Sequence, residues 1–390
     1  MANYSYIPIL PISTNLDWIM GDSRPNYSGT PGLFNRNLTW ETINTLNIGF
    51  DAGFIRNKLL VNFDWFERRT LDMIGPAEDL PSYLGASPPK VNNSELKTEG
   101  FELIISWQDD ITSDLDYSVK LSLGDNKSTV VEYPNPTGQI NNWYNGKTVG
   151  EIWGYETEGF FESDAEVDQH ADQSAFYSRW QAGDIKYKDL NGDGKIGWGS
   201  NTLDDPGDKK IIGYSLPRYE FGIMATINYK RFDFNMFWQG VGKRDHHFAS
   251  SNNDQLFWSG VAGGKVGLVD HLDFWSPEGS DISDIGGGPD AYYPRPYYNK
   301  KEHYKNCQTQ TKYLQDASYI RLKNIQLGYT IPSKVTNIFK EARIYVTGKN
   351  VLLFTDLMSA FDPEVLEGPR GAGKSYPLSK FWGAGINIVF

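Results

Sequence analysis

The sequence predicts an all-β protein, a transmembrane antiparallel β-barrel with long loops between some of its strands. Several segments alternate apolar and polar residues over about ten positions, the pattern of a barrel strand that faces lipid on one side. The connections between these segments are short and long in turn, as in outer-membrane barrels. The chain ends on such a segment, Phe381 to Phe390, and an unpaired apolar edge of this kind would promote aggregation unless a neighbouring strand covers it.

The composition agrees with a protein of strands and loops. The 390 residues include 12 Trp, 23 Tyr and 39 Gly, and the mean hydropathy is -0.50. No apolar run reaches the ~18 residues that a membrane helix needs. The net charge of -12, without clusters of Lys and Arg, argues against a nucleic-acid partner. The single cysteine, Cys307, excludes an internal disulfide.

Nine segments carry the two-residue period of a strand. The segment from Tyr219 to Tyr229 begins and ends on an aromatic residue, as expected where a strand crosses both interfaces of a bilayer. Lys230 and Arg231 predict a tight hairpin turn, and a slip of the apolar phase near Asn324 predicts a β-bulge. The apolar alternation covers Leu46 to Phe54, Leu59 to Trp65, Phe101 to Trp107, Tyr117 to Leu123, Tyr219 to Tyr229, Phe232 to Trp238, Tyr319 to Tyr329, Arg343 to Val351 and Phe381 to Phe390.

The strand positions predict the organisation of the chain. Residues 1-43 are expected to form a loop segment outside the cell, and residues 44-390 the strands of a barrel. Nine is an odd number, whereas single-chain bacterial barrels have even strand numbers, so we expect the C-terminal portion of a larger plugged barrel, with the plug domain and the first strands elsewhere. Long loops are expected at 69-97, 127-216, 241-317 and 355-380.

Eight short segments resemble one known family, the SusC-like (SusC/RagA) branch of TonB-dependent outer-membrane transporters. The likeness covers nearly the whole chain. It is carried by Leu38-Thr39-Trp40-Glu41, Asn47 to Asp51, Thr98 to Glu102, Gly183 to Asp189, Ile211 to Gly213, Ala317 to Ile325, Gly348 to Val351 and Phe361 to Glu364.

The resemblance implies a function and a location. Such a protein lies in the outer membrane of a Gram-negative, Bacteroidota-like cell, and it is a nutrient importer, not an enzyme. The resemblance also implies a SusD-like surface lipoprotein as a lid, a TonB complex that binds through an N-terminal region missing here, and glycan or peptide substrates too large for porins. Because the chain contains no recognisable plug domain, energy coupling cannot be assigned to its residues.

Two other classes of function remain open from the residues. The first is a secreted, calcium-stabilised β-sandwich that binds carbohydrate, although a sandwich would not sort its loops by length. The second is a glycan-degrading enzyme. Its support is weak because the paired carboxylates, such as Asp109-Asp110 and Asp204-Asp205, are adjacent in sequence and so are not placed across a scissile bond.

One loop has the spacing of a calcium-binding motif. Asp189, Asn191 and Asp193 stand at alternate positions before Gly194, in the pattern D-x-N-x-D-G. Their oxygens can converge on a hard cation because the glycine allows a sharp turn, and the Lys195 carbonyl adds a ligand. The motif predicts a structural Ca²⁺ ion, and the alternative is a plain cluster of Asn-Gly and Asp-Gly turns.

The twelfth position of this motif departs from the pattern. It is Ser200 where a bidentate Glu is expected, so the carboxylate would come from Asp204, Asp205 or Asp208. The resemblance favours Asp208, which precedes the matching segment at Ile211. An insertion from Gly197 to Leu203 separates it from the loop.

Aromatic residues crowd the long loops and are candidates for ligand contact. Aromatic faces can stack on sugar rings or clamp a partner, whereas the alternative is that large loops need packed cores of their own. A phosphate-loop pattern also occurs at Gly368 to Ser375, but Pro377 and a strand follow it where a helix is required, so we reject a nucleotide site. The candidates for ligand binding are Trp143, Trp153, Trp180, Trp258 and Trp275.

Overall fold

The regular secondary structure of the chain is mainly β-strand in a computed structural model. Contacts divide it into two compact units, one of Met1–Asn47, Phe66–Glu99 and Lys127–Val149, the other of Ile48–Trp65, Gly100–Asn126 and Gly150–Phe390. No helix among the described residues is long and apolar enough to cross a membrane. The structure describes residues 10–14, 19, 21–24, 26–29, 31–77, 80–247, 269–279, 286–332, 340–366 and 375–390.

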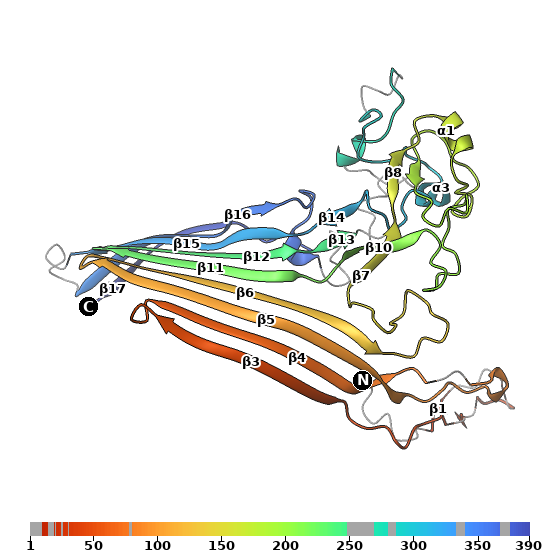
Figure 1. Cartoon of the computed structure of the whole chain (residues 1–390), viewed down its shortest axis with the longest axis horizontal. Coiled ribbons are helices and arrows are strands. Elements are labelled where there is room, and N and C mark those ends of the chain that lie inside the picture. The colour runs from red at the N-terminus through yellow and green to blue at the C-terminus, as the bar shows by residue number, and fades with distance from the viewer. Residues whose placement is uncertain are drawn as a thin grey trace. The chain divides into compact units, whose positions relative to one another are not determined.

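The nine predicted strands form one antiparallel sheet, which confirms the fold class (Figure 1). Its order is β17-β16-β15-β12-β11-β6-β5-β4-β3, so nearly all neighbours in the sheet are also neighbours along the chain. The two edges, β3 and β17, are not paired with each other, and the sheet is therefore not closed. The strands are β3 (Thr42–Phe54), β4 (Leu59–Gly75), β5 (Val91–Thr112), β6 (Leu115–Glu132), β11 (Arg218–Tyr229), β12 (Phe232–Lys243), β15 (Tyr319–Ile331), β16 (Glu341–Thr355) and β17 (Phe381–Val389).

The register of the sheet separates an apolar face from a polar one. Because side chains alternate along a strand, residues paired across strands share a face. One row of pairs consists of Tyr117, Ile227, Phe234, Leu327, Val346 and Ala384. The next row, on the opposite face, consists of Ser118, Thr226, Asn235, Gln326, Thr347 and Gly383.

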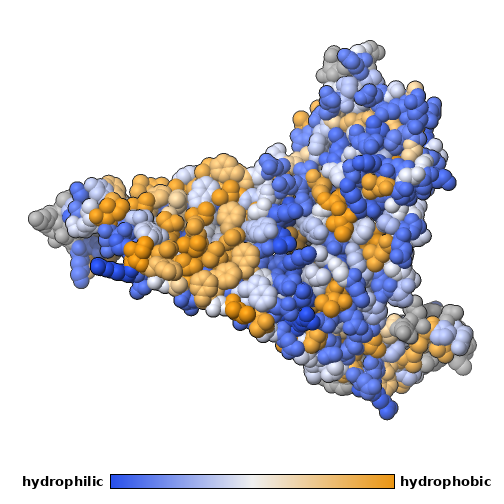
Figure 2. Space-filling view, viewed as in Figure 1, coloured by the Kyte–Doolittle hydropathy of each residue, from blue (hydrophilic) through white to orange (hydrophobic). Residues whose placement is uncertain are grey.

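The apolar face is open to the surroundings. Leu327 is 51% exposed and Val346 is 54% exposed, although neither side chain has a polar group. Figure 2 shows a broad hydrophobic area over the strands, with hydrophilic residues over the long connections. An exposed apolar area that continues across neighbouring strands exceeds what a monomer in water usually tolerates.

Local predictions within the sheet are confirmed. Tyr229 pairs with Phe232, so Lys230 and Arg231 form the expected tight turn. The register between β15 and β16 shifts between Leu322 and Asn324, at the predicted bulge. The terminal strand pairs with β16, as expected for a strand that follows it along the chain.

The ends of β4, β5 and β6 differ from the prediction. β4 continues to Gly75 and β5 begins at Val91, so both enter the connection expected at 69-97. β6 likewise continues to Glu132, into the connection expected at 127-216. The backbone ladder does not require apolar side chains, and it continues where both faces of a strand are polar, beyond the reach of a hydrophobic period.

The long connections contain small sheets of their own. Within the unit that ends at Phe390, these sheets lie at one end of β11, β12 and β15, and the C-terminus lies at the other end (Figure 1). The pairs are β7 (Glu151–Tyr155) with β10 (Lys209–Tyr214), β8 (Thr157–Phe160) with β9 (Ile185–Tyr187), and β13 (Asp245–His247) with β14 (Leu314–Asp316). The remaining elements are β1 (Ile12–Ser13), β2 (Tyr27–Ser28), α1 (Asp164–Gln169), α3 (Lys300–Tyr304), and short 3-10 helices at Ser82–Leu84, Val269–Leu272 and Pro363–Val365.

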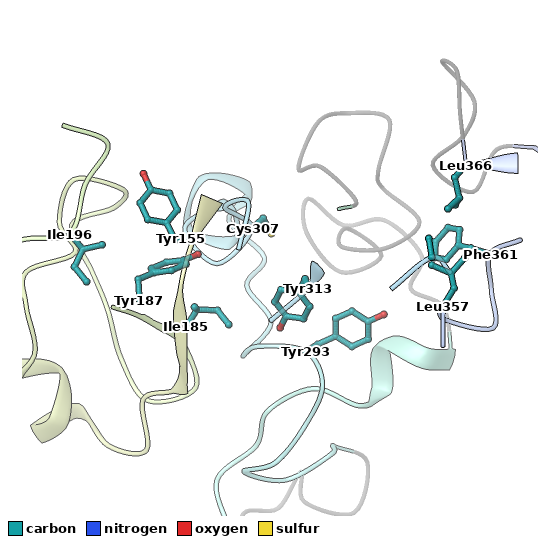
Figure 3. Close-up of a cluster of buried hydrophobic side chains, with 11 residues drawn as sticks. Tyr155, Ile185, Tyr187, Ile196, Tyr293, Cys307, Tyr313, Leu357, Phe361 and Leu366 are labelled. Carbon is teal, nitrogen blue, oxygen red and sulfur yellow. The ribbon is translucent and has the colours of Figure 1, made fainter. Parts of the chain in front are cut away.

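A buried cluster holds these connections together (Figure 3). Tyr155 and Tyr187 lie side by side, with ring centroids 5.4 Å apart, and Phe176 packs edge-on against both rings. Tyr313 is fully buried, and its hydroxyl donates to the carbonyl of Tyr292 at 2.9 Å. The connections are therefore packed structures and not only tethers between strands.

Charged residues anchor the connection after β16 to the sheet. Arg321 on β15 is 2% exposed and contacts Asp362 at 2.7 Å and Glu364 at 3.0 Å. Asp362 also accepts the N–H of Leu378 at 2.9 Å, and Glu364 contacts Lys323 at 2.8 Å. Two segments of the predicted resemblance, Ala317 to Ile325 and Phe361 to Glu364, thus meet in one buried ion-pair network.

The substitution Asp362→Ala is predicted to loosen the connection after β16. It leaves the Arg321 guanidinium buried without its main partner, which costs about 3–5 kcal/mol in comparable buried pairs. Limited proteolysis should then cleave residues 356–366 faster. The exposed Asp356 is the matched control, and equal cleavage rates in Asp356→Ala and Asp362→Ala would contradict the anchoring role.

The β13–β14 pair is predicted to weaken in acid. Burial lowers the pKa of His246 and of His247 to about 4, with the Arg244 charge contributing at His246. Since both values lie below the ordinary value near 6.5, the unfolded segment binds protons first between pH 6.5 and 4, and the stability present above pH 6.5 is lost as pH falls.

Hydrogen exchange at pH 7 and pH 5, corrected for the intrinsic rate, measures this effect. Protection of residues 245–247 and 314–316 should fall at pH 5, while that of β11 stays constant. The double variant His246→Gln, His247→Gln should lose the pH dependence, and its persistence in that variant would show that other groups cause it.

Candidate functional site

A pocket of about 780 Å³ opens among the long connections. Its lining comes from the β8–β9 pair with the start of α1, from Ala182, from the segment around Trp275, from residues 289–295 and from Lys312. The side chain of Ser163 caps α1 by accepting the N–H of Glu166 at 3.2 Å. The polar and aromatic residues that line the pocket are Glu158, Phe160, Glu162, Asp164, Lys186, Trp275, Glu278, Asp290, Arg295 and Lys312.

The pocket presents charges of both signs. Lys312 is half-buried, its ammonium nitrogen lies 4.4 Å from the centroid of the Phe160 ring, and burial lowers its pKa despite Asp273 and Asp290 nearby. The Arg295 guanidinium donates a long hydrogen bond, 3.5 Å, to the carbonyl of Ala182, and the backbone N–H of Arg295 donates to the carbonyl of Gly183 at 2.9 Å. Acidic groups outnumber basic ones in the lining, so the pocket can offer both donors and acceptors to a polar ligand.

Of the five tryptophans predicted to contact a ligand, Trp275 alone lines this pocket in the described part of the chain. Its backbone N–H donates to the carbonyl of Tyr293 at 2.9 Å, and the N–H of Tyr293 donates to the carbonyl of Asp273 at 2.9 Å, which fixes the segment. Gly183, at φ +87°, lies directly against the indole, and a side chain there would collide with the ring. The ring is 5% exposed, so its contribution to a ligand contact is confined to an edge.

The structure does not bring the other predicted tryptophans to this pocket. Trp143 packs on Tyr133, with ring centroids 5.7 Å apart. Trp153 lies in β7, and its buried indole N–H has no hydrogen-bond partner among the described residues. Trp258 lies outside the described residues, and ligand binding by all five tryptophans stays a prediction.

Trp180 packs within a cluster of aromatic and charged side chains. Its indole N–H donates to the carbonyl of Tyr177 at 2.8 Å, and the buried ammonium of Lys305 lies 5.0 Å from its ring. The same ammonium contacts Asp184 at 2.6 Å and lies 4.3 Å from the Tyr297 ring. Burial lowers the pKa of Lys305, and Asp184 opposes that shift, so this cluster joins residues far apart in the chain through one compensated charge.

The predicted calcium loop has a well-defined backbone. The N–H groups of Gly192 and Gly194 donate to the two carboxylate oxygens of Asp189 at 2.6 and 2.9 Å. The N–H of Lys195 donates to Asp193 at 2.7 Å, and the N–H of Asp193 donates to Asn191 at 2.9 Å. Burial acts to raise the pKa of Asp189, but the N–H groups of Gly194 and Gly192 outweigh it and hold that pKa below its ordinary value.

Asp208, the carboxylate that the resemblance favours over Asp204 and Asp205, hydrogen-bonds to this loop across the insertion. Its two oxygens accept the N–H groups of Leu190 and Gly197, each at 2.9 Å. Within the described ranges, however, no group of three His, Cys, Asp or Glu side chains is placed to hold a metal ion. An ion here would also need the Asn191 amide oxygen and the Lys195 carbonyl, and metal binding stays a prediction.

Sequence reasoning missed Lys312, Arg295 and Asp290 as pocket residues. They lie in irregular connections that lack a hydrophobic period. The pocket forms only because segments more than a hundred residues apart in the sequence pack together. No pattern within any one of these segments marks them.

Comparison with known proteins gives relatives of one kind, although no family model matches the chain. The chain is 28% identical over 364 residues to the TonB-dependent receptor P3 of Formosa agariphila, covering 89% of this chain and 33% of that protein. It is 23% identical over 406 residues to the TonB-dependent receptor SusC of Bacteroides thetaiotaomicron, covering 100% of this chain and 36% of that protein. The chain thus spans about a third of the length of these relatives.

Solved structures share the fold. The RagAB peptide importer in its open-open state superposes with a TM-score of 0.68 at 19% identity, covering 100% of this chain and 38% of that chain. Its closed-closed state gives a TM-score of 0.65 at 20% identity, covering 99% of this chain and 39% of that chain. The relatives agree with the resemblance seen in the eight sequence segments, since they are TonB-dependent receptors and one of them is SusC.

Proposed function

We propose that this chain, the C-terminal barrel part of a SusC-like TonB-dependent transporter of the outer membrane and not an enzyme, walls the path by which oligosaccharides or peptides enter the cell. The observation that carries the proposal is the sheet, with an open apolar row of side chains on one face and a polar row on the other. Such a sheet suits a wall between lipid and a water-filled, plugged lumen.

The polar face supports the same assignment. Arg343 on β16 forms an ion pair with Asp233 on β12, on the same face as Asn235 and Thr347. Charged pairs of this kind are costly to expose to lipid but stable against water or against the polar surface of a plug. Their position opposite the apolar row makes outer-membrane lipid the contact of one face only.

A β-sandwich that binds carbohydrate is less consistent with the sheet. A sandwich buries its apolar face against a second sheet. Here the further sheets of the described ranges have two strands each, and residues such as Leu327 and Val346 remain about half exposed. Lipid explains this exposure, whereas a soluble sandwich does not.

The proposal includes two partners. The long connections form a packed structure with a polar pocket beyond one end of the strands, and a SusD-like surface lipoprotein would close over this end as a lid. A TonB complex would act through the N-terminal region of the whole protein. The pocket, with donors such as Lys312 and acceptors such as Asp290, suits a polar substrate or a polar surface of the lid.

The orientation of the sheet is tested by Ile223→Lys and Met224→Lys on β11. Ile223 pairs with Trp238 and Leu121 on the apolar face, whereas Met224 pairs with Lys120 on the polar face. A lysine on the lipid face near the bilayer middle costs about 2–4 kcal/mol, so Ile223→Lys should reduce the folded, heat-modifiable protein in outer membranes. Met224→Lys, its neighbour, should assemble normally, and the reverse ranking would rule out the proposed wall.

The lid and the substrate are tested by isolating the full-length transporter from native outer membranes. A surface lipoprotein should co-purify in near-equal amount, and mass spectrometry should detect bound oligosaccharide or peptide. Asp290→Lys reverses one charge of the pocket and should lower the recovery of lipoprotein or of ligand, whichever the pocket contacts. Recovery of the transporter alone, without either companion, would contradict this part of the proposal.

A further inference from the structure

We propose that the pocket among the long connections binds the C-terminal carboxylate of a peptide substrate, and that Lys312 and Arg295 are the groups that receive it. The inference rests on the proposed function, because it assigns a substrate class to the pocket of the transporter. It goes further by naming one chemical group of the substrate and the two side chains that contact this group.

The charges of the pocket are sorted by depth. The basic residues of the described lining, Lys186, Arg295 and Lys312, are all partly buried. The acidic residues of the lining are all exposed to solvent. They are Glu158, Glu162, Asp164, Glu278 and Asp290. The pocket therefore has a cationic interior and an acidic rim.

Two of the three cations lack a carboxylate partner in the described part of the chain. The ammonium of Lys186 contacts Glu166 at 2.7 Å. The ammonium of Lys312 has neither a hydrogen bond nor an ion pair to a described residue. The Arg295 guanidinium has one long hydrogen bond within the same ranges, 3.5 Å to the carbonyl of Ala182. A partly buried cation without a counter-charge has lost hydration that nothing replaces, so an anionic ligand would stabilise both groups.

The two cations are held at the same end of the β8–β9 pair. Phe160, the last residue of β8, pairs with Ile185, the first residue of β9. The Lys312 ammonium lies 4.4 Å from the centroid of the Phe160 ring. The backbone N–H of Arg295 donates at 2.9 Å to the carbonyl of Gly183, two residues before Ile185. Since both side chains also line the same pocket, the two oxygens of one carboxylate suit a position between them.

The pKa of Lys312 agrees with a cation that lacks a close partner. Burial lowers this pKa, although the charges of Asp273 and Asp290 act in the opposite direction. Both aspartates are exposed, and neither forms an ion pair with Lys312. A carboxylate in direct contact with the ammonium would raise the pKa again.

The acidic rim and the aromatic rings favour a peptide over an acidic oligosaccharide. An oligosaccharide with many carboxylates would bring negative charge against the rim, whereas a basic peptide has one terminal carboxylate followed by positive side chains. Sugar stacking needs a bare aromatic face. Trp275 is 5% exposed, however, and the Lys312 ammonium lies against the Phe160 ring. The pocket therefore suits a basic peptide that enters with its C-terminus first.

The size of the pocket suits the end of a peptide. Its volume of about 780 Å³ lies within the range of roughly 300–1,000 Å³ for small-molecule sites. A longer peptide would place its last residues in the pocket and its remainder outside. Recognition of the terminus would then depend little on the length of the peptide.

Calorimetry on the detergent-purified full-length transporter tests the carboxylate contact. The probe is a tetrapeptide of alternating alanine and lysine that carries either a free C-terminal carboxylate or a C-terminal amide. The free acid should bind about ten times more tightly than the amide or better, because the amide loses the charge-assisted contacts. Equal affinities of the two forms would overturn the proposed subsite.

Three variants assign the contact to the named side chains. Lys312→Met should abolish the preference for the free acid, whereas Lys312→Arg should keep it. Lys188→Met is the matched control, because the Lys188 ammonium contacts Glu156 at 3.2 Å outside the pocket lining, and this variant should keep the full preference. An equal loss of preference in Lys188→Met and Lys312→Met would contradict the assignment.

A further variant and a second probe complete the test. If Lys312→Met does not fold, Arg295→Gln should still reduce the preference for the free acid severalfold, and an unchanged preference would count against the subsite. A tetramer of galacturonate should bind more weakly than the peptide, and tighter binding of the saccharide would overturn the peptide assignment. These outcomes leave the membrane assembly of Ile223→Lys and Met224→Lys unaffected, so a failure of this inference is distinguishable from a failure of the proposed function.

Discussion

The structure depends on backbone hydrogen bonds between strands that have one apolar face and one polar face. Lipid offers no hydrogen bonds, so each strand in it must satisfy its N–H and C=O groups on its neighbours. The alternation along β11 then places Ile223 and Met224 on opposite faces, and pairing with β6 and β12 extends this division into rows. A shift of one residue in the pairing would move every apolar side chain of a strand to the polar face. The bulge between Leu322 and Asn324 is confined to one step of the β15–β16 pairing.

In the long connections, buried charges and aromatic rings hold segments together, as backbone hydrogen bonds do in the sheet. The network around Arg321 fixes the connection after β16, and Lys305 joins Asp184 to a set of aromatic rings. Both arrangements connect segments that are remote in sequence, and both bury charge only where an opposite charge compensates it. The buried carboxylate of Asp208 is compensated differently, by the backbone N–H groups of Leu190 and Gly197.

The comparisons and the physical argument support one another at different levels. The relatives are TonB-dependent receptors and the RagAB structures share the fold, but neither assigns a role to the pocket residues. The pocket brings Trp275 together with Lys312 and Asp290, whereas Trp180 belongs to a packed cluster. Local packing therefore separates a candidate contact residue from an aromatic that stabilises the connections, a distinction that the amino-acid type does not make.

The sequence alone determined the nine strands, their faces, the Lys230 hairpin and the bulge near Asn324, because period and turn chemistry are local properties. It also determined the loop from Asp189 to Lys195, whose spacing is contiguous. Only the tertiary structure decided where β4 and β6 end and where β5 begins, since backbone pairing continues through polar residues such as Asn92, Asn93 and Ser94 of β5. It also decided the pocket, the Arg321 network and the hydrogen bonds of Asp208 to Leu190 and Gly197, because these depend on segments that meet only after the chain has folded.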